Sequence, residues 1–267
     1  AKQLPSDSNR FDFRDPKVWK AADGSYRCVM VNCDNKGDGR AVLFESKDGF
    51  SWNFKSILAQ NNGKFGKMWE CPDLFELDGK AVLIVSPMEM EAEGLEYPNG
   101  HGVVCQIGTY DDETGTFTCE HAQSVDYGID FYAPQPTQTP DGRRVMIGWM
   151  QNWAFVNQHA ETEPWFGQMA LPRELSIVDG KLIQLIINLE AQNDFNPGYP
   201  LLKRAAYYCG CMISSQYGAV FVKSHYEKIQ KVYSIWICTM PTKKWEYNIS
   251  SYQLIEKHLI GNKQADR

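Results

Sequence analysis

The sequence lacks a long hydrophobic segment: its 267 residues contain no run of about 18 apolar residues, the length that a membrane-spanning helix needs. Its first ten residues are polar, without the basic and then apolar order of a signal peptide. We therefore expect a cytoplasmic protein with no membrane partner. Its eight cysteines are scattered, and the closest pair, Cys209 and Cys211, is spaced too tightly for a CxxC metal or redox motif. We expect reduced thiols.

Helical periodicity is nearly absent from the first 182 residues. Short apolar stretches alternate there with turn residues, which is typical of antiparallel hairpins, and three Asp-Gly pairs, at 78–79, 141–142 and 179–180, suit the positive φ of tight turns. Recurring hairpins with interleaved Trp and Phe favour propeller blades, and the pattern alone also fits a sandwich. The expected strands include residues 26–32, 41–46, 80–86, 102–109, 143–150 and 167–171.

The charge changes sign along the chain. Up to residue 182 there are 17 Lys and Arg against 27 Asp and Glu, a net −10, and from residue 183 there are 10 against 6, a net +4. The second part predicts a strand at 182–190, a helix at about 199–217 and a strand at 232–238, which together favour a parallel βαβ unit. We expect two domains, 1–182 and 183–267. The apolar face of the expected helix consists of Leu202, Ala205, Ala206, Cys209, Met212 and Ile213.

Two carboxylates stand among proline, cysteine and aromatic neighbours: Asp15 in an Arg-Asp-Pro motif, and Glu70 in a Trp-Glu-Cys-Pro motif. Cleavage of a glycosidic bond needs one carboxylic acid that an apolar surround keeps protonated, and a second carboxylate that attacks or stabilises the anomeric carbon. Glu70, between Trp69 and Cys71, fits the acid, and Asp15 beside Arg14 fits the ionised partner. A structural ion pair of Arg14 with Asp15, with Glu70 as an ordinary strand-end acid, is the alternative.

Five motifs, taken together and in this order, resemble glycoside hydrolase family 32 over residues 10 to 182. This resemblance implies a mainly β fold, a partial five-bladed β-propeller with a funnel on its axis, followed here by the short α/β (βαβ) segment. The five motifs are FRDPKVW at 13–19, WECPDLF at 69–75, DFYAPQ at 130–135, GWM at 148–150 and LPREL at 171–175.

The resemblance also implies retaining chemistry on β-fructofuranosides such as sucrose, sucrose 6-phosphate or fructans, a small carbohydrate partner and no metal or other cofactor. Glu70 would be the acid/base, and Asp15 the transition-state stabiliser that holds fructose hydroxyls. Arg14 would orient Asp15. Trp149 would offer an aromatic face and Asp130 a hydrogen-bonding carboxylate, which suit a sugar ring. The expected substrate-binding residues are Arg14, Trp69, Cys71, Asp130 and Trp149. The sequence sets no oligomeric state.

The sequence departs from the family in one respect. The family's nucleophile is an aspartate in an Asn-Asp-Pro-Asn-Gly motif on the first blade, and the given sequence has no such motif. We therefore expect the first blade and the C-terminal β-sandwich to be missing. Loss of a nucleophile raises the barrier by about 8 kcal/mol or more. The chain is then expected to be inactive or weakly active, or to bind sugar without turnover.

Residues from about 180 to 262 resemble a second family, the PD-(D/E)XK nuclease-like transposase proteins. In that fold Glu190 would ligate Mg²⁺ and Gln192, two residues along the same strand face, would replace the usual lysine. Only under this alternative would the chain bind Mg²⁺ and nucleic acid. The resemblance rests on INLEAQ at 187–192, PGYP at 197–200, MISSQYG at 212–218 and VYSIWI at 232–237.

Overall fold

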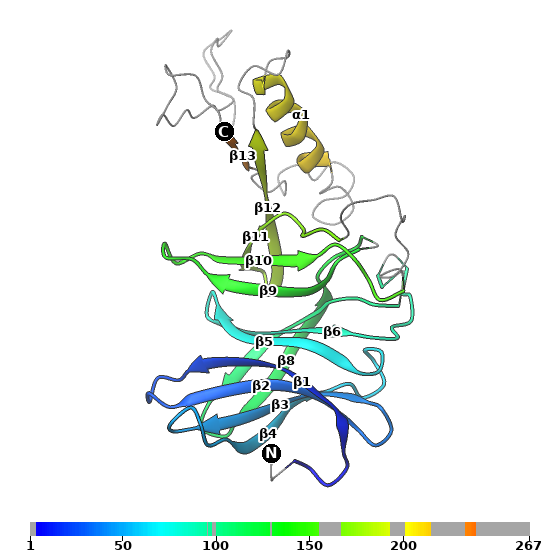
Figure 1. Ribbon diagram of the computed structural model, residues 1–267, viewed down its shortest axis with the longest axis vertical. Helices are drawn as coiled ribbons and strands as arrows, with labels where there is room; N and C mark the ends of the chain where they lie inside the picture. Colours follow the sequence, from blue (N-terminus) through cyan, green and yellow to red (C-terminus); the bar gives the residue numbers. More distant parts are fainter. Residues whose placement is uncertain are drawn as a thin grey trace.

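The computed structural model describes residues 4–94, 96–97, 100–128, 130–154, 167–192, 201–214 and 233–238. Three antiparallel sheets are stacked one above another, and a segment with a helix extends from the third (Figure 1). The strands of each sheet follow one another along the chain as up-and-down neighbours, which is the construction of a propeller blade. The mainly β fold with a partial propeller, predicted from the sequence, is confirmed.

In this structure the three sheets are numbered in chain order as the first, second and third blade, and this first blade is not the nucleophile-bearing blade that the sequence was expected to lack. The first contains β1 (Ser8–Lys20), β2 (Tyr26–Asp34), β3 (Gly39–Ser46) and β4 (Asn53–Gln60). The second contains β5 (Trp69–Leu77), β6 (Lys80–Pro87), β7 (Val104–Asp111) and β8 (Thr116–Ser124). The third contains β9 (Tyr132–Gln138), β10 (Arg144–Trp149), β11 (Arg173–Val178) and β12 (Lys181–Gln192), and β13 (Tyr233–Cys238) extends it.

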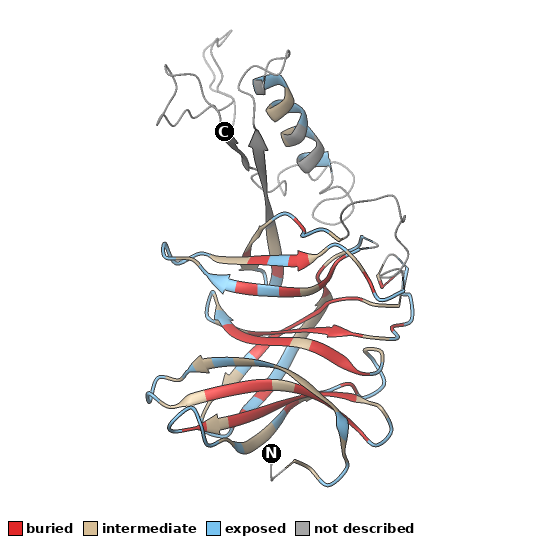
Figure 2. Ribbon diagram, in the orientation of Figure 1, coloured by how far each residue is buried: buried red, intermediate tan, exposed pale blue. Residues whose placement is uncertain are grey.

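The second blade is buried on both faces. On β6, Leu83 and Val85 belong to the hydrophobic core shared with the first blade, whereas Val82 and Ile84 belong to the core shared with the third. A strand covered on both sides reads as a continuous apolar run rather than as an alternation, which explains the Ala-Val-Leu-Ile-Val sequence at 81–85. Figure 2 shows this concentration of buried residues in the middle of the stack.

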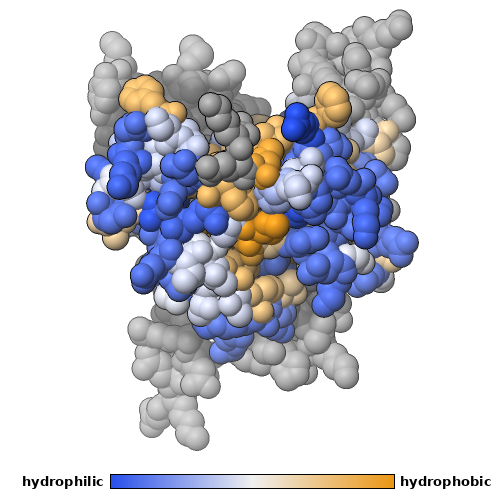
Figure 3. All heavy atoms as spheres, turned by 90° about the horizontal axis from the view of Figure 1, so that it is seen from below, coloured by the Kyte–Doolittle hydropathy of each residue, from blue (hydrophilic) through white to orange (hydrophobic). Residues whose placement is uncertain are grey.

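The first blade also has an apolar outer face. Val42 and Phe44 of β3 are buried there among Phe13, Trp52 and other partly buried side chains. Figure 3 looks along the stack from the side of this blade and shows apolar side chains in a band between hydrophilic flanks. In a closed propeller each blade face packs against a neighbouring blade, and this face has the same apolar character.

Two of the three Asp-Gly turns have the expected backbone. Asp78 and Gly79 have φ of 50° and 76°, and Asp179 and Gly180 have φ of 50° and 72°, as two-residue hairpins require. At 141–142 only Gly142 has a positive φ, of 88°. The remaining pair is therefore a different kind of turn.

The strand expected at residues 167–171 is wrong. These residues make a single bridge between Met169 and Trp149, and the third strand of the blade begins at Arg173 instead. Gly167 has a φ of 81°, outside the β region, and Pro172 has no N–H for a ladder.

The predicted βαβ order is present. Helix α1 (Leu201–Ser214) lies between β12 and β13, and these two strands pair in parallel from Ile187 with Tyr233 to Gln192 with Cys238. The predicted apolar helix face is only partly covered, because Leu202 and Ile213 are 53% and 37% exposed. The same strand β12 pairs antiparallel with β11 through residues 181–186, so it runs without a break across residue 182. The two-domain division there stays a prediction.

Replacing Gly108 by alanine is expected to destabilise the second blade by about 2 kcal/mol, because overpacked cores cost about 1–3 kcal/mol. A Cβ at this position would meet the backbone oxygen of Thr118 at 1.9 Å. Backbone on β8 cannot move aside as a flexible side chain would. Urea unfolding measures the loss, and Gly210→Ala is the control, since no atom of the described residues lies within 4 Å of a Cβ there. An unchanged midpoint for Gly108→Ala would contradict this packing.

Candidate active site

The innermost strands of the three blades share one backbone irregularity. Asp15 on β1, Cys71 on β5 and Ala133 on β9 have positive φ of 59°, 47° and 48°, and each precedes a proline. At each place the inner strand advances three residues while its neighbour advances two, which is a β-bulge. Positive φ is uncommon for residues other than glycine, so three matching cases mark three equivalent positions in the blades.

The residues just before these three positions meet at one point. Arg14 donates from Nε and Nη2 to Oε1 of Glu70, at 3.0 and 2.9 Å. Tyr132 places its hydroxyl oxygen 2.9 Å from Oε2 of the same carboxylate. The repeated bulge therefore brings one side chain from each blade into a cluster around Glu70, which we call the Glu70 cluster and define as Arg14, Glu70, Tyr132 and Trp153.

Trp153 completes this cluster from the segment after β10. Its indole Nε1 donates to Oε2 of Glu70 at 2.9 Å, and the residue is 45% exposed. Glu70 itself is only 8% exposed. Each carboxylate oxygen is thus held by named donors, and the partly exposed Trp153 lies at the solvent side of the cluster.

Two details of the predicted pairing are wrong. Glu70 is buried, but Arg14 and two other polar groups surround it instead of an apolar environment. In the part of the chain that the structure describes, the ion pairs of Arg14 are to Glu70 at 2.9 Å and to Asp12 at 3.0 Å, and not to Asp15. The long guanidinium reaches across from β1 to β5, which adjacency in the sequence does not reveal.

Asp15 instead contacts the strand that carries Glu70. Its Oδ2 accepts a hydrogen bond from the backbone N–H of Cys71 at 2.9 Å. Since Cys71 directly follows Glu70, this bond fixes Asp15 beside the cluster. The two predicted carboxylates therefore lie on adjacent inner strands, at the same level of the propeller.

Cys71 is a protonated thiol. Burial raises its pKa to about 12, and the negative charges of Asp15 and Glu70 add to the effect. Because thiolate is the reactive form, we expect iodoacetamide to modify Cys71 roughly tenfold or more slowly in the native chain than in urea. Mass spectrometry of the Cys71 peptide measures both rates. Equal rates would show that the thiol is neither buried nor charge-suppressed.

The other three predicted sugar contacts, Trp69, Trp149 and Asp130, lie in different surroundings. Trp69 is fully buried in the core and donates from Nε1 to the carbonyl of Phe65 at 2.9 Å, so it has no face open to a sugar. Trp149 packs edge-on against Trp153, with ring centroids 5.9 Å apart, and is thereby joined to the Glu70 cluster. Asp130 is exposed and accepts a hydrogen bond of 2.5 Å from the buried side chain of Asn152.

Sequence reasoning missed Tyr132, Trp153, Asn152 and His101. His101 stacks edge-on against Tyr132, with centroids 6.2 Å apart, and burial lowers its pKa while the charge of Glu70 opposes this shift. A signal for Tyr132 was available. It stands one residue before an X-Pro pair, as Arg14 and Glu70 do.

A second layer of contacts lies three residues further along the same strands. Lys17 forms an ion pair with Asp73 at 2.8 Å and donates to Oε1 of Gln135 at 3.2 Å and to the carbonyl of Pro136 at 3.3 Å. Burial raises the pKa of Asp73, and the Lys17 ammonium opposes that shift. This axial layer of Lys17, Asp73 and Gln135 again takes one residue from each blade.

Among the residues that the structure describes, no three His, Cys, Asp or Glu side chains are grouped so as to hold a metal ion. Glu190 and Gln192 stand opposite Trp236 and Cys238 in the β12–β13 ladder, but their side chains lie outside the described residues. The predicted Mg²⁺ role of these two residues stays a prediction. No helix in the described ranges has the length and apolar character to cross a membrane.

Comparison with known proteins gives a consistent result. Residues 1–185 match the Glycosyl hydrolases family 32 N-terminal domain. The chain is 40% identical over 177 residues to sucrose-6-phosphate hydrolase of Escherichia coli, covering 64% of this chain and 36% of that protein. It is 39% identical over 181 residues to the enzyme of the same name from Bacillus subtilis, covering 64% and 37%.

Solved structures agree. The Bombyx mori family 32 beta-fructofuranosidase, a mutant in complex with sucrose, superposes with a TM-score of 0.61 at 39% identity, over 68% of this chain and 38% of that one. Sucrose-6-phosphate hydrolase from Lactobacillus gasseri has a TM-score of 0.58 at 27% identity, over 68% and 38%. This chain therefore spans little more than a third of the length of these relatives.

Proposed function

Because the chain belongs to glycosyl hydrolase family 32, we propose that its Glu70 cluster is the acid/base part of a site that hydrolyses β-fructofuranosides. One observation carries the proposal: the first and third blades direct side chains onto a buried carboxylate of the second blade, beside a second carboxylate at Asp15. The bulges in the three inner strands bring these side chains together, and the contacts hold the carboxylate in a fixed place, as catalysis requires.

The contacts of Tyr132 indicate which oxygen of Glu70 would carry the proton in the acid form. The Tyr132 oxygen lies 2.9 Å from Oε2 of Glu70 and 2.9 Å from the carbonyl oxygen of Ser86. A carbonyl only accepts, and a hydroxyl has one hydrogen. When Tyr132 donates to Ser86, its oxygen is left to accept a hydrogen bond from the carboxyl of Glu70. Arg14 donates to Oε1 and Trp153 to Oε2, so in the acid form Oε2, which also faces the Tyr132 oxygen, would carry the proton.

In the proposed reaction Glu70 transfers this proton to the glycosidic oxygen as the bond from that oxygen to the fructosyl carbon breaks. Asp15 accepts hydrogen bonds from fructose hydroxyls and stabilises the positive charge that develops. The nucleophilic aspartate of the retaining reaction comes from the family's Asn-Asp-Pro-Asn-Gly motif, which is not in the given sequence. For the chain by itself, sugar binding with little or no turnover is therefore the second candidate function.

A chimaera tests the catalytic proposal. The part of this chain that matches the Escherichia coli relative, 64% of the chain, replaces the matched segment of that protein, and fructose release from sucrose and from sucrose 6-phosphate is measured. Release by the chimaera is expected, together with little or none by the chain alone. A folded chimaera that releases no fructose from either substrate would argue against the proposal.

The cytoplasmic location expected from the sequence stays a prediction.

A further inference from the structure

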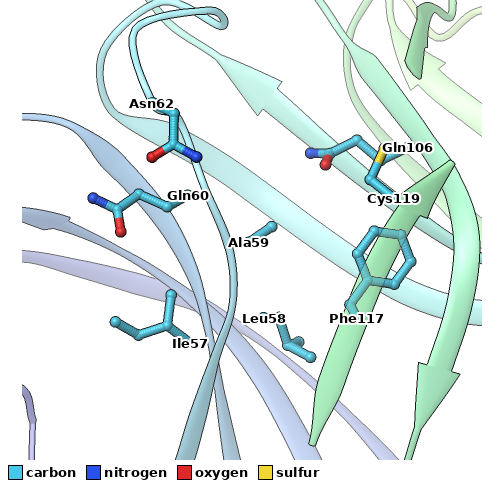
Figure 4. Close-up of a pocket in the computed structure, with 8 residues that line it drawn as sticks. All are labelled: Ile57, Leu58, Ala59, Gln60, Asn62, Gln106, Phe117 and Cys119. Atoms are coloured by element: carbon cyan, nitrogen blue, oxygen red, sulfur yellow. The ribbon is translucent and has the colours of Figure 1, made fainter. Parts of the chain in front are cut away.

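A pocket of about 450 Å³ lies at the outer edge between the first and second blades (Figure 4). One wall comes from β4 and the residues just after it, and the other from β7 and β8. Near one end the two blades touch, where Ser56 donates to the carbonyl of Gly115 at 2.6 Å. None of the residues lining the pocket belongs to the inner strands β1, β5 and β9, so it is separate from the Glu70 cluster.

The pocket has an apolar floor and a polar rim. Leu58 and Phe117 line it and are only 4% and 8% exposed. Gln60, Asn62 and Cys119 line it as exposed residues. Small-molecule sites typically combine an apolar surface with a few polar groups that fix orientation, and this pocket has both.

One polar group in the pocket has no partner. Gln106 is 6% exposed, and its Nε2 makes no hydrogen bond with any residue that the structure describes. Figure 4 shows the carboxamides of Gln106 and Asn62 turned toward the space between them, from opposite walls. Buried polar groups in native proteins nearly always have a hydrogen-bond partner, so the Gln106 amide points to a ligand that supplies one.

The lining also restricts the chemistry of that ligand. Among the residues that the structure describes, the lining holds three carboxamides, Gln60, Asn62 and Gln106, and no charged side chain. Carboxamides both donate and accept, which suits hydroxyl groups, and an uncharged lining does not suit a phosphate or a carboxylate. The C–H face of a sugar ring can pack on the apolar floor. We propose that this pocket binds a neutral sugar unit, as a second site outside the catalytic one.

Cys119 gives a local measurement of this site that does not depend on Glu70. N-ethylmaleimide modifies the native full chain, and mass spectrometry follows the Cys119 peptide with and without fructose, sucrose or a short inulin. Partial burial raises the pKa of the Cys119 thiol, so labelling is done at mildly alkaline pH. A bound sugar is expected to slow the modification several-fold, in the parent chain and equally in Glu70→Gln.

Two variants complete the test. Gln106→Leu replaces the amide by a shorter apolar side chain and should remove the protection, as should Asn62→Gly at the exposed rim. Gln138→Leu, on the exposed end of β9, is the matched control and should keep it. Absence of protection by any of the three sugars would overturn the proposal. Protection by adenosine alone, or protection that both pocket variants retain, would also overturn it. None of these results would affect the catalytic proposal.

Discussion

Glu70→Gln is expected to lower fructose release by the chimaera roughly 10²–10⁴-fold, the usual contribution of a general acid. Glutamine keeps the shape and can still accept from Arg14, but it has no proton to give to the glycosidic oxygen. Four contacts from Arg14, Tyr132 and Trp153 fix this side chain in its place. Initial rates of fructose release measure the effect.

The matched control for this substitution is Glu76→Gln on the same strand. Glu76 is exposed and lies on β5 six residues further along, so its loss should leave the rate near that of the parent chimaera. A Glu70→Gln chimaera that stays as active as Glu76→Gln would remove Glu70 from the acid role. An aryl fructoside with a good leaving group, which needs less protonation, should recover part of the lost rate.

Lys17→Met is expected to destabilise the chain by about 3 kcal/mol, the lower end of what breaking a buried ion pair costs. The side chain of Asp73 is only 4% exposed, and the variant leaves it without its cation. The estimate stays at the lower end because the Lys17 side chain is 32% exposed, so water screens part of the interaction. Urea unfolding measures the loss.

Two controls separate the charge from the packing. The double variant Lys17→Met with Asp73→Leu should lie within about 1 kcal/mol of the parent, because an apolar pair of similar size often replaces a buried ion pair without loss. The deficit of Lys17→Met should also shrink at low pH. Burial raises the pKa of Asp73 above its ordinary 3.8, and removal of Lys17 removes a group that opposes this shift. The deficit is therefore full near neutrality and fades as the pH falls and Asp73 becomes protonated in the folded variant and then in the folded parent. A deficit that is independent of pH would contradict this explanation.

Much of the fold followed from local chemistry. The Asp-Gly turns at 78–79 and 179–180 predicted two hairpins, because few residues tolerate their positive φ. The strand β6 could be predicted from its continuous apolar sequence, which reflects burial on both faces. The segment 167–171 was misread because its apolar residues do not reveal the positive φ of Gly167. The predicted helix is present as α1, but the exposure of Leu202 and Ile213 does not follow from spacing, which does not show what a helix face packs against.

The site was harder to predict from the sequence. Motifs pointed to Asp15 and Glu70, but the partner of Arg14 depends on a contact between residues 56 positions apart. Tyr132 and Trp153 reach Glu70 from 62 and 83 positions away. The sequence shows that Arg14, Glu70 and Tyr132 each stand two residues before a proline. Only the structure shows that the bulges at these places bring the three side chains together.

The most direct test of the account is a calorimetric titration of the purified chain with sucrose, done in the Gln106→Leu background so that the outer pocket does not contribute. The account predicts saturable binding that Asp15→Asn weakens roughly tenfold or more, because a hydrogen bond to a charged acceptor contributes about 1.5–3 kcal/mol. Asp23→Asn, in an exposed turn, should bind as the parent does. Equal binding by Asp15→Asn and the parent, or no binding by the folded chain, would contradict a fructoside site at Asp15 and Glu70.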